Sequence, residues 1–134
     1  MQLVIGSLEL TILFWSLAVY GIYLGVQSLL YRLNYGVLFA QTARDNEGPP
    51  GVFLGRAERA LRNFLETWPS FIVLALIAHL VDQNDQVVLW GAVIWLACRL
   101  AYLPLYLFGV FGVRSLVWTI GALGLFAMFF GLLF

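Results

Sequence analysis

Several polar side chains lie close together in a segment that is otherwise apolar. The segment is GRAERALRNFLETWPSF, residues 55–71, in which Arg59, Arg62, Asn63 and Glu66 recur at intervals of three and four residues. At this spacing the four side chains share one face of a helix. Arginine forks bind carboxylates through two parallel hydrogen bonds. The segment therefore predicts a polar helix face suited to an anionic ligand.

A second set of chemically capable residues follows in RLAYLPLY, residues 99–106. Tyr102 and Tyr106 come three and seven residues after Arg99, on nearly the same helical face. Pro104 has no amide proton, so we expect a kink between the tyrosines. The pattern indicates a water-accessible cleft. Tyrosines also anchor helices at membrane interfaces, and that alternative stays open.

The third stretch is VRSLVWTIG, residues 113–121, which places Arg114 and Ser115 at the start of a helix. Free backbone N–H groups and the helix dipole favour an anion at such a position. Arg114 strengthens this preference. The alternative is an arginine whose side chain reaches the lipid headgroups and only sets topology.

The composition shows which kind of molecule must position these residues. Of the 134 residues, 63% are apolar and 10% are charged, which is typical of a membrane protein and not of a soluble domain. All seven basic residues are arginine, and the formal net charge is zero, so nucleic acid is not expected as a partner. The single cysteine, Cys98, has no partner for a disulfide and no metal-ligand spacing around it, so we expect it to be a packing residue. No metal site is predicted.

Four apolar stretches have the roughly 20 residues that a membrane-spanning helix needs. The first lacks a basic leader and a cleavage site, so we expect it to be retained. A polar connection with a Pro-Pro-Gly cluster follows it, and the later links are short, which favours antiparallel neighbours. We therefore expect residues 1–134 to form one all-α domain, a four-transmembrane-helix up-down bundle. The predicted helices are about 8–31, 57–81, 86–108 and 113–134.

The arginines predict how the bundle is oriented in the membrane. Five of them flank the first connection and Arg114 flanks the third, whereas the VDQNDQ turn carries two acids and no base. The positive-inside rule then places the first and third connections in the cytoplasm and both termini on the other side.

Glu66 and Arg99 are predicted to lie at matching depths. Glu66 comes roughly 13 to 14 Å along a helix that starts near residue 57. Arg99 lies nine residues from the cytoplasmic end, near residue 108, of the third predicted helix. Charged groups inside a membrane normally face the bundle interior and are paired. We therefore expect a Glu66–Arg99 salt bridge, with a purely structural ion pair as the alternative to a functional one.

The motifs ERALRNFLETWPSF, RLAYLPLY and RSLVW, in this order across four predicted helices, resemble those of the MAPEG family, the membrane-associated proteins in eicosanoid and glutathione metabolism. The resemblance covers roughly residues 44–134. The chain most resembles the small bacterial inner-membrane branch of the family, in which ARDN precedes the second helix.

The resemblance implies a homotrimer with a glutathione site at each subunit interface, open to the cytoplasm. Arg62, Asn63 and Glu66 would then hold the charged and polar groups of the tripeptide, and Tyr102 and Tyr106 would line the site with Arg99 nearby. Arg114 would stabilise the thiolate, followed by Ser115 as in the prostaglandin-synthase branch. Arg32 matches the family's first-helix arginine only ambiguously, and Trp118 stands where a tyrosine can occur.

Three functions remain open at this point. The chain could be an enzyme that conjugates glutathione to a lipophilic electrophile or reduces a lipid peroxide. It could be a non-catalytic member that binds a lipid or another ligand. It could also be a small accessory subunit of a larger membrane complex. Arg44 and Asp45 are expected to order the first connection before they take any part in catalysis.

Overall fold

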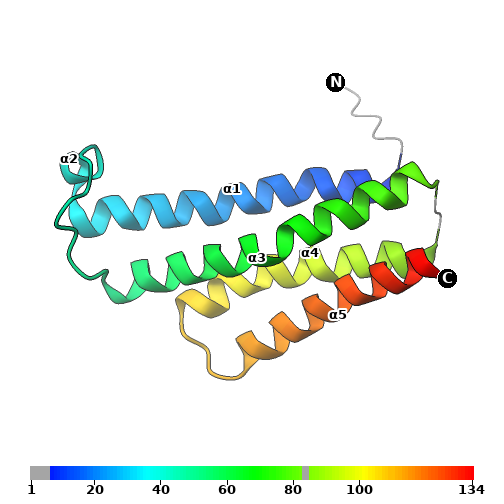
Figure 1. The fold of residues 1–134 in the computed structure, drawn as a ribbon. Helices are drawn as coiled ribbons and strands as arrows, with labels where there is room; N and C mark the ends of the chain where they lie inside the picture. Colours follow the sequence, from blue (N-terminus) through cyan, green and yellow to red (C-terminus); the bar gives the residue numbers. More distant parts are fainter. Residues whose placement is uncertain (1–6, 83–84) are drawn as a thin grey trace.

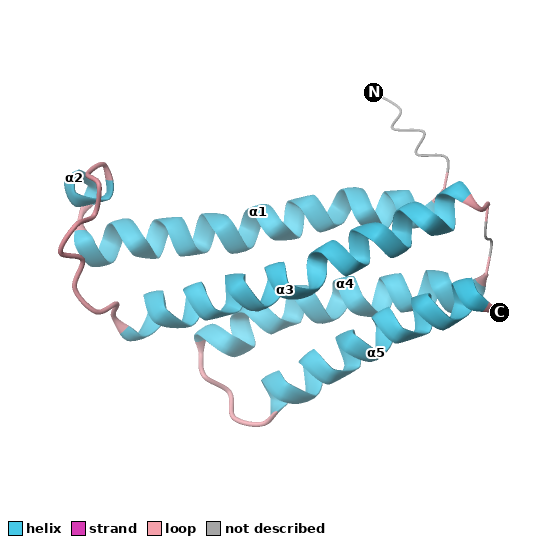
Figure 2. Ribbon diagram, in the orientation of Figure 1, coloured by secondary structure: helices cyan, strands magenta, loops and turns pink. Residues whose placement is uncertain are grey.

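The computed structural model describes residues 7–82 and 85–134, and these residues form helices and loops without any strand (Figure 2). The predicted turn after residue 81 includes residues 83–84, which lie outside the described residues. The expected bundle of four long helices is confirmed (Figure 1). The helices are α1 (Leu8–Tyr35), the short α2 (Val37–Ala40), α3 (Val52–Leu80), α4 (Gln86–Leu107) and α5 (Val113–Leu133).

Two helices begin at residues whose side chains cap them. The Ser7 hydroxyl accepts a hydrogen bond from the Leu10 amide at 3.3 Å, and the Asp85 carboxylate accepts one from the Val87 amide at 2.9 Å. α1 and α3 are longer than predicted, by four residues at the end of α1 and five at the start of α3. The added residues are RLNY at the end of α1 and VFLGR at the start of α3, next to the arginines where the prediction placed the helix ends.

The helices pack in an order that leaves one side of the bundle open. α1 packs mainly on α3, and α4 packs closely on α5. Within the described chain, α1 does not contact α5, and α3 meets α5 through few residues. The start of α1 and the end of α5 lie at the same end of the bundle, and the α4–α5 loop lies at the opposite end (Figure 1).

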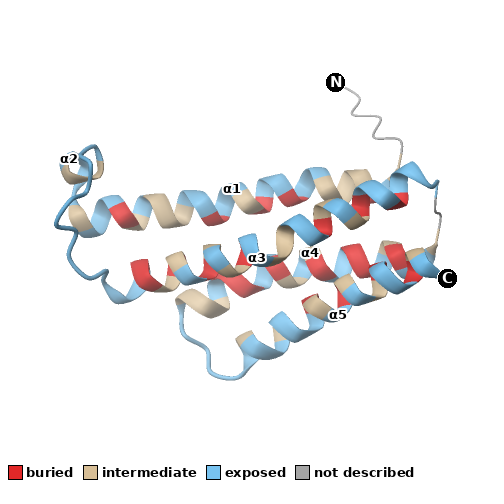
Figure 3. Cartoon of the chain, in the orientation of Figure 1, coloured by how far each residue is buried: buried red, intermediate tan, exposed pale blue. Residues whose placement is uncertain are grey.

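All four long helices have the length and composition to cross a membrane. Their buried residues face one another, and their outer faces are exposed along most of their length (Figure 3). Large apolar side chains such as Trp15, Leu29 and Phe126 lie on these outer faces, each more than half exposed. Lipid is the environment in which such faces are stable, so the chain is an integral membrane protein.

Aromatic rings fill the core between α1, α3 and α4. Phe71 stacks on Trp95 with ring centroids 4.1 Å apart, and Tyr20 stacks on Trp68 at 4.7 Å. The Trp68 indole N–H donates to the Ser16 hydroxyl at 2.9 Å, so one polar end of this core is satisfied. The same core supports the α3 segment that carries the predicted polar residues.

Two prolines lie inside helices. Pro69 lies in the middle of α3, which bends about midway along its length (Figure 1). Pro104 lies in the last turn of α4, between the two predicted site tyrosines. Each proline lacks the N–H that would bond to the preceding turn.

The first connection is fastened to the end of α1. The Tyr31 hydroxyl donates to the Glu47 carboxylate, and the Tyr35 hydroxyl donates to the Gly48 carbonyl. The Arg44 guanidinium lies over the Tyr31 ring, 4.3 Å from its centroid. Arg44 therefore links the first connection to the end of α1, a contact suited to the expected role of Arg44 in ordering this loop.

Candidate functional site

A polar cleft of about 290 Å³ opens between α3, α4 and α5, near the end of the bundle that carries the α4–α5 loop. Five of the nine residues predicted for the site line it, and they come from three different helices. The complete lining consists of Asn63, Tyr102, Tyr106, Arg114, Ser115, Trp118 and Thr119. The sequence motifs therefore converge in space within a single chain.

The cleft exists because α5 leaves α4 through a tight loop that is held in place from α3. Gly109 and Gly112 have φ angles of 67° and 76°, which residues with a side chain rarely adopt. The Arg56 guanidinium donates to the Leu107 carbonyl at 2.8 Å at the end of α4, and its terminal nitrogens also lie against Gly109. Arg56 thus fastens the loop that sets the start of α5.

Arg114 lies in the first turn of α5, half-buried, and its guanidinium lies 4.8 Å from the centroid of the Tyr106 ring. No carboxylate among the described residues lies within ion-pair distance of it. A ring face attracts a cation but does not neutralise it. The positive charge of Arg114 is therefore directed into the cleft beside Ser115 and is available to an anion.

The predicted Glu66–Arg99 salt bridge is wrong. Arg99 is fully buried, and its Nη1 donates to the Asn63 side-chain oxygen at 2.8 Å. Glu66 is exposed and accepts a hydrogen bond of 3.5 Å from the Asn63 side-chain nitrogen. The rotation of α3 turns Asn63, one turn before Glu66, toward Arg99 on α4. Asn63 therefore separates the two charges.

Arg99 lies behind the wall of the cleft and does not line it. Its guanidinium is flanked by the rings of Trp95 and Tyr102, whose centroids lie 5.8 Å and 5.5 Å away. Its Nε and Nη2 atoms are buried and have no hydrogen-bond partner among the residues that the structure describes. The Tyr23 hydroxyl donates to the backbone carbonyl of Arg99 at 2.6 Å, which ties α1 to this point of α4.

Two more predicted arginines, besides Arg99, do not line the cleft. Arg62 lies next to Asn63 on α3, but its side chain is exposed and does not line the cleft. Arg32 is on α1, where its Nη1 donates to the Ser28 carbonyl at 3.0 Å and its side chain borders a much smaller pocket. Because α1 does not contact α5 in the described chain, Arg32 is remote from Arg114 within one subunit.

Trp118 and Thr119 line the cleft but were not predicted as site residues. They come three and four residues after Ser115, so they lie on the same face of α5. The Thr119 hydroxyl donates to the Ser115 carbonyl at 2.9 Å, which holds it against its own helix. Helical spacing from Ser115 could have identified both residues.

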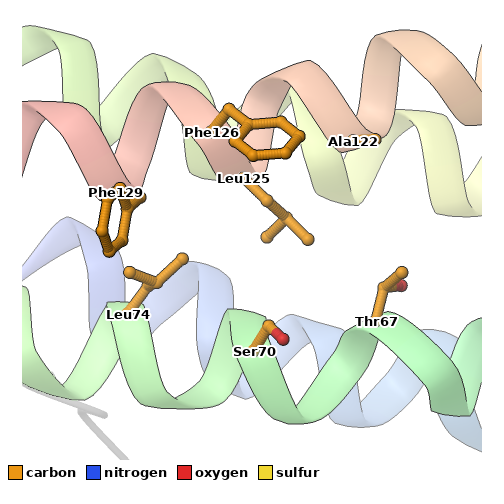
Figure 4. Close-up of a pocket in the computed structure, with 7 residues that line it drawn as sticks. All are labelled: Thr67, Ser70, Leu74, Ala122, Leu125, Phe126 and Phe129. Carbon is orange, nitrogen blue, oxygen red and sulfur yellow. The ribbon is translucent and has the colours of Figure 1, made fainter.

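An apolar groove of about 380 Å³ continues between α3 and α5, one helical turn beyond the cleft. Leu125, Phe126 and Phe129 on α5 face Leu74 across this groove (Figure 4). The hydroxyl groups of Thr67 and Ser70 lie on its α3 wall, and Ala122 is at the end nearer to the cleft. The groove follows from the sparse contact between α3 and α5. Among the described residues, no cluster of side chains could hold a metal ion.

These features define an integral membrane protein, a four-helix bundle whose polar cleft carries an unpaired arginine next to an apolar groove. The MAPEG family model matches residues 10–134, and the chain belongs to the MAPEG family. Its members are membrane proteins with glutathione-related transferase, peroxidase or related roles. No curated protein and no solved structure gives a significant match to the chain.

Proposed function

We propose that the chain is a glutathione-dependent membrane transferase or peroxidase that acts on a lipophilic electrophile. The observation that carries this proposal is the unpaired guanidinium of Arg114, which faces a polar cleft in a member of the MAPEG family. A volume of about 290 Å³ is near the lower end of the range for small-molecule sites. Glutathione supplies the anionic and hydrogen-bonding groups that such a lining can bind.

The side chains around the cleft suggest how the tripeptide binds. Asn63 offers an amide group to it, and Glu66, hydrogen-bonded to Asn63, offers a carboxylate for the ligand's ammonium group. Arg62, exposed at the outer side of the same helix, would reach a ligand carboxylate from above the cleft. Tyr102 and Tyr106 provide aromatic walls.

Arg114 and Ser115 would activate the thiol. A cation favours the charged form of a neighbouring sulfur, and the Ser115 hydroxyl can donate a hydrogen bond to it. In a transfer reaction the thiolate forms a bond to an electrophilic carbon, and the leaving group departs with the bonding electrons. In peroxide reduction the thiolate attacks one peroxide oxygen and the O–O bond breaks. Two glutathione molecules supply the two electrons and end as the disulfide, and the hydroperoxide ends as an alcohol and water.

The apolar groove supports the choice of a lipophilic acceptor. It begins one turn from the cleft, between the same two helices, and it is larger than the cleft. An alkyl or aryl group in the groove would place the reacting end of the molecule near Arg114. The same groove favours the second candidate function, a non-catalytic member that binds a lipid.

The assembly and the orientation belong to the same proposal. A homotrimer would allow Arg32, remote from the cleft of its own chain, to contact a ligand held by a neighbour. The cleft lies at the end of the bundle where the arginines are concentrated, so it would open to the cytoplasm with both termini on the other side. The membrane would be a bacterial inner membrane.

Two variants separate binding from activation in the purified protein. Arg114→Ala should lower turnover with a chloronitrobenzene or a lipid hydroperoxide more than it weakens glutathione binding. Arg62→Ala should weaken binding first. Arg44→Ala is the matched control, since Arg44 is stacked on Tyr31 away from the cleft. Absence of both turnover and binding at millimolar glutathione would overturn the proposal and favour an accessory subunit, whereas binding without turnover would favour the non-catalytic member.

A further inference from the structure

Arg99 is a buried cation without a carboxylate partner in the described chain. Its exposed fraction is 0%, and only one of its guanidinium nitrogens, Nη1, makes a hydrogen bond. Burying an unpaired charge has a high free-energy cost. Charged residues inside the membrane are therefore rare and commonly mark functional sites. Among the described residues, the side chain to which it donates a hydrogen bond is Asn63, which belongs to the lining of the cleft.

The hydrogen bond determines which way the Asn63 amide points. A guanidinium has only donors, so the atom 2.8 Å from Nη1 must be the amide oxygen. The amide NH₂ group is therefore turned away from Arg99, and one of its N–H groups donates to the Glu66 carboxylate at 3.5 Å. Because Asn63 also lines the cleft, its second N–H is left for a ligand there. Without the guanidinium, only the longer hydrogen bond of 3.5 Å to the exposed Glu66 carboxylate would orient the amide, so its oxygen could also turn toward a ligand.

We propose that Arg99 is a positioning residue that fixes the Asn63 amide so that its NH₂ group donates into the cleft. The ligand group bound at Asn63 is then a hydrogen-bond acceptor, a carboxylate or a peptide carbonyl oxygen. Arg99 never touches the ligand, because it is fully buried behind Asn63. This inference rests on the proposed function only for the identity of the ligand, since the Arg99–Asn63 arrangement is independent of it.

A stability cycle tests the arrangement without any ligand. Arg99→Met removes the charge and keeps an apolar side chain of similar length, a change that buried charges often tolerate. Asn63→Asp places a carboxylate oxygen where the amide oxygen lies. When Arg99 is present, Asn63→Asp should raise the Tm or lower it only slightly. In the Arg99→Met background, the same substitution should lower the Tm clearly. Asn46→Asp, which adds the same charge in the exposed loop, should shift the Tm equally in both backgrounds.

A binding cycle tests the consequence for the ligand. Asn63→Asp removes the NH₂ donor, so glutathione should bind about tenfold more weakly. The Asn63→Asp variant should nevertheless be no less stable than the Arg99→Met, Asn63→Asp double variant. Arg99→Met should also weaken binding in the wild-type background but not in an Asn63→Ala background. A merely structural role for Arg99 would instead weaken binding equally in both.

The outcomes distinguish this inference from the proposed function. Equal effects of Asn63→Asp on the Tm with and without Arg99 would overturn the inference, whatever the protein binds. Additive effects of Arg99→Met and Asn63→Ala on glutathione affinity would overturn it as well. A clear coupling in the Tm together with no glutathione binding would support the Arg99–Asn63 arrangement and overturn only the proposed function.

Discussion

Replacing Gly91 by alanine should separate α4 from α5. A Cβ atom at Gly91 would lie 2.6 Å from the Gly124 carbonyl oxygen and 2.8 Å from the Met128 Cγ. A Cβ at Gly124 would in turn meet the Gly91 carbonyl at 2.7 Å. These contacts are too short for carbon, and a backbone carbonyl cannot swing aside. The two helices must therefore move apart by several tenths of an ångström.

The matched control for this change is Gly21→Ala in α1, where an added Cβ meets no atom within 4 Å. Overpacking of a close contact typically costs about 1–3 kcal/mol. Alanine in an open helical position is expected to be neutral or to stabilise by about 0.5–1 kcal/mol. The two variants should therefore differ by about 1–4 kcal/mol in the free energy of unfolding.

The assay is unfolding of the purified protein in mixed micelles, by titration with a denaturing detergent or by heat. We expect Gly91→Ala to unfold well before the wild type and Gly21→Ala to unfold with it or later. Equal stability of the two variants would refute the reasoning, because α4 and α5 would then not be held together by the close contact at Gly91 and Gly124.

Three further changes test other contacts of the bundle. Ser16→Ala leaves the Trp68 indole N–H without its acceptor and should cost about 1–2 kcal/mol in thermal unfolding, and the loss should shrink in a Trp68→Phe background. Tyr23→Phe removes the hydrogen bond to the Arg99 carbonyl and should lower the unfolding free energy by about 1 kcal/mol, and an unchanged Tm would contradict that contact. Arg56→Gln should speed hydrogen exchange in the loop that follows Leu107 while the exchange of α1 stays the same.

Much of this architecture could be predicted from the sequence because a membrane imposes a length on its helices. The four apolar spans predicted the number and order of the long helices. The resemblance of the motifs to the MAPEG family, and not their spacing alone, implied that Asn63, Tyr102 and Arg114 share one site, and all three line the cleft. Periodicity states which side chains share a face, but it does not state how that face is rotated toward its neighbour. For this reason Glu66 was paired with Arg99 in the prediction, whereas Asn63 makes the contact.

Other features depend on packing that a single helix pattern does not contain. The close approach at Gly91 and Gly124 requires knowing which two helices meet and at which height. The apolar groove depends on the sparse contact between α3 and α5, so no local motif predicts it. Trp118 and Thr119 could be predicted in part, because their helical spacing from Ser115 places them in the lining once Ser115 is known to lie in the cleft.

The central claim is that Arg114 converts bound glutathione to its thiolate. An unperturbed thiol has a pKa of about 8.5, so only a few per cent is ionised at neutral pH. A nearby guanidinium, partly shielded from water, should lower this pKa, and each unit corresponds to about 1.4 kcal/mol in favour of the thiolate.

The most direct test is the near-ultraviolet absorbance of thiolate when glutathione is mixed with the purified protein. We expect thiolate absorbance below pH 7.5 with the wild-type protein. Arg114→Ala should abolish the absorbance while it weakens tripeptide binding less severely. Glutathione that binds to the wild type but stays a thiol throughout this pH range, or an undiminished thiolate signal in Arg114→Ala, would contradict the claim.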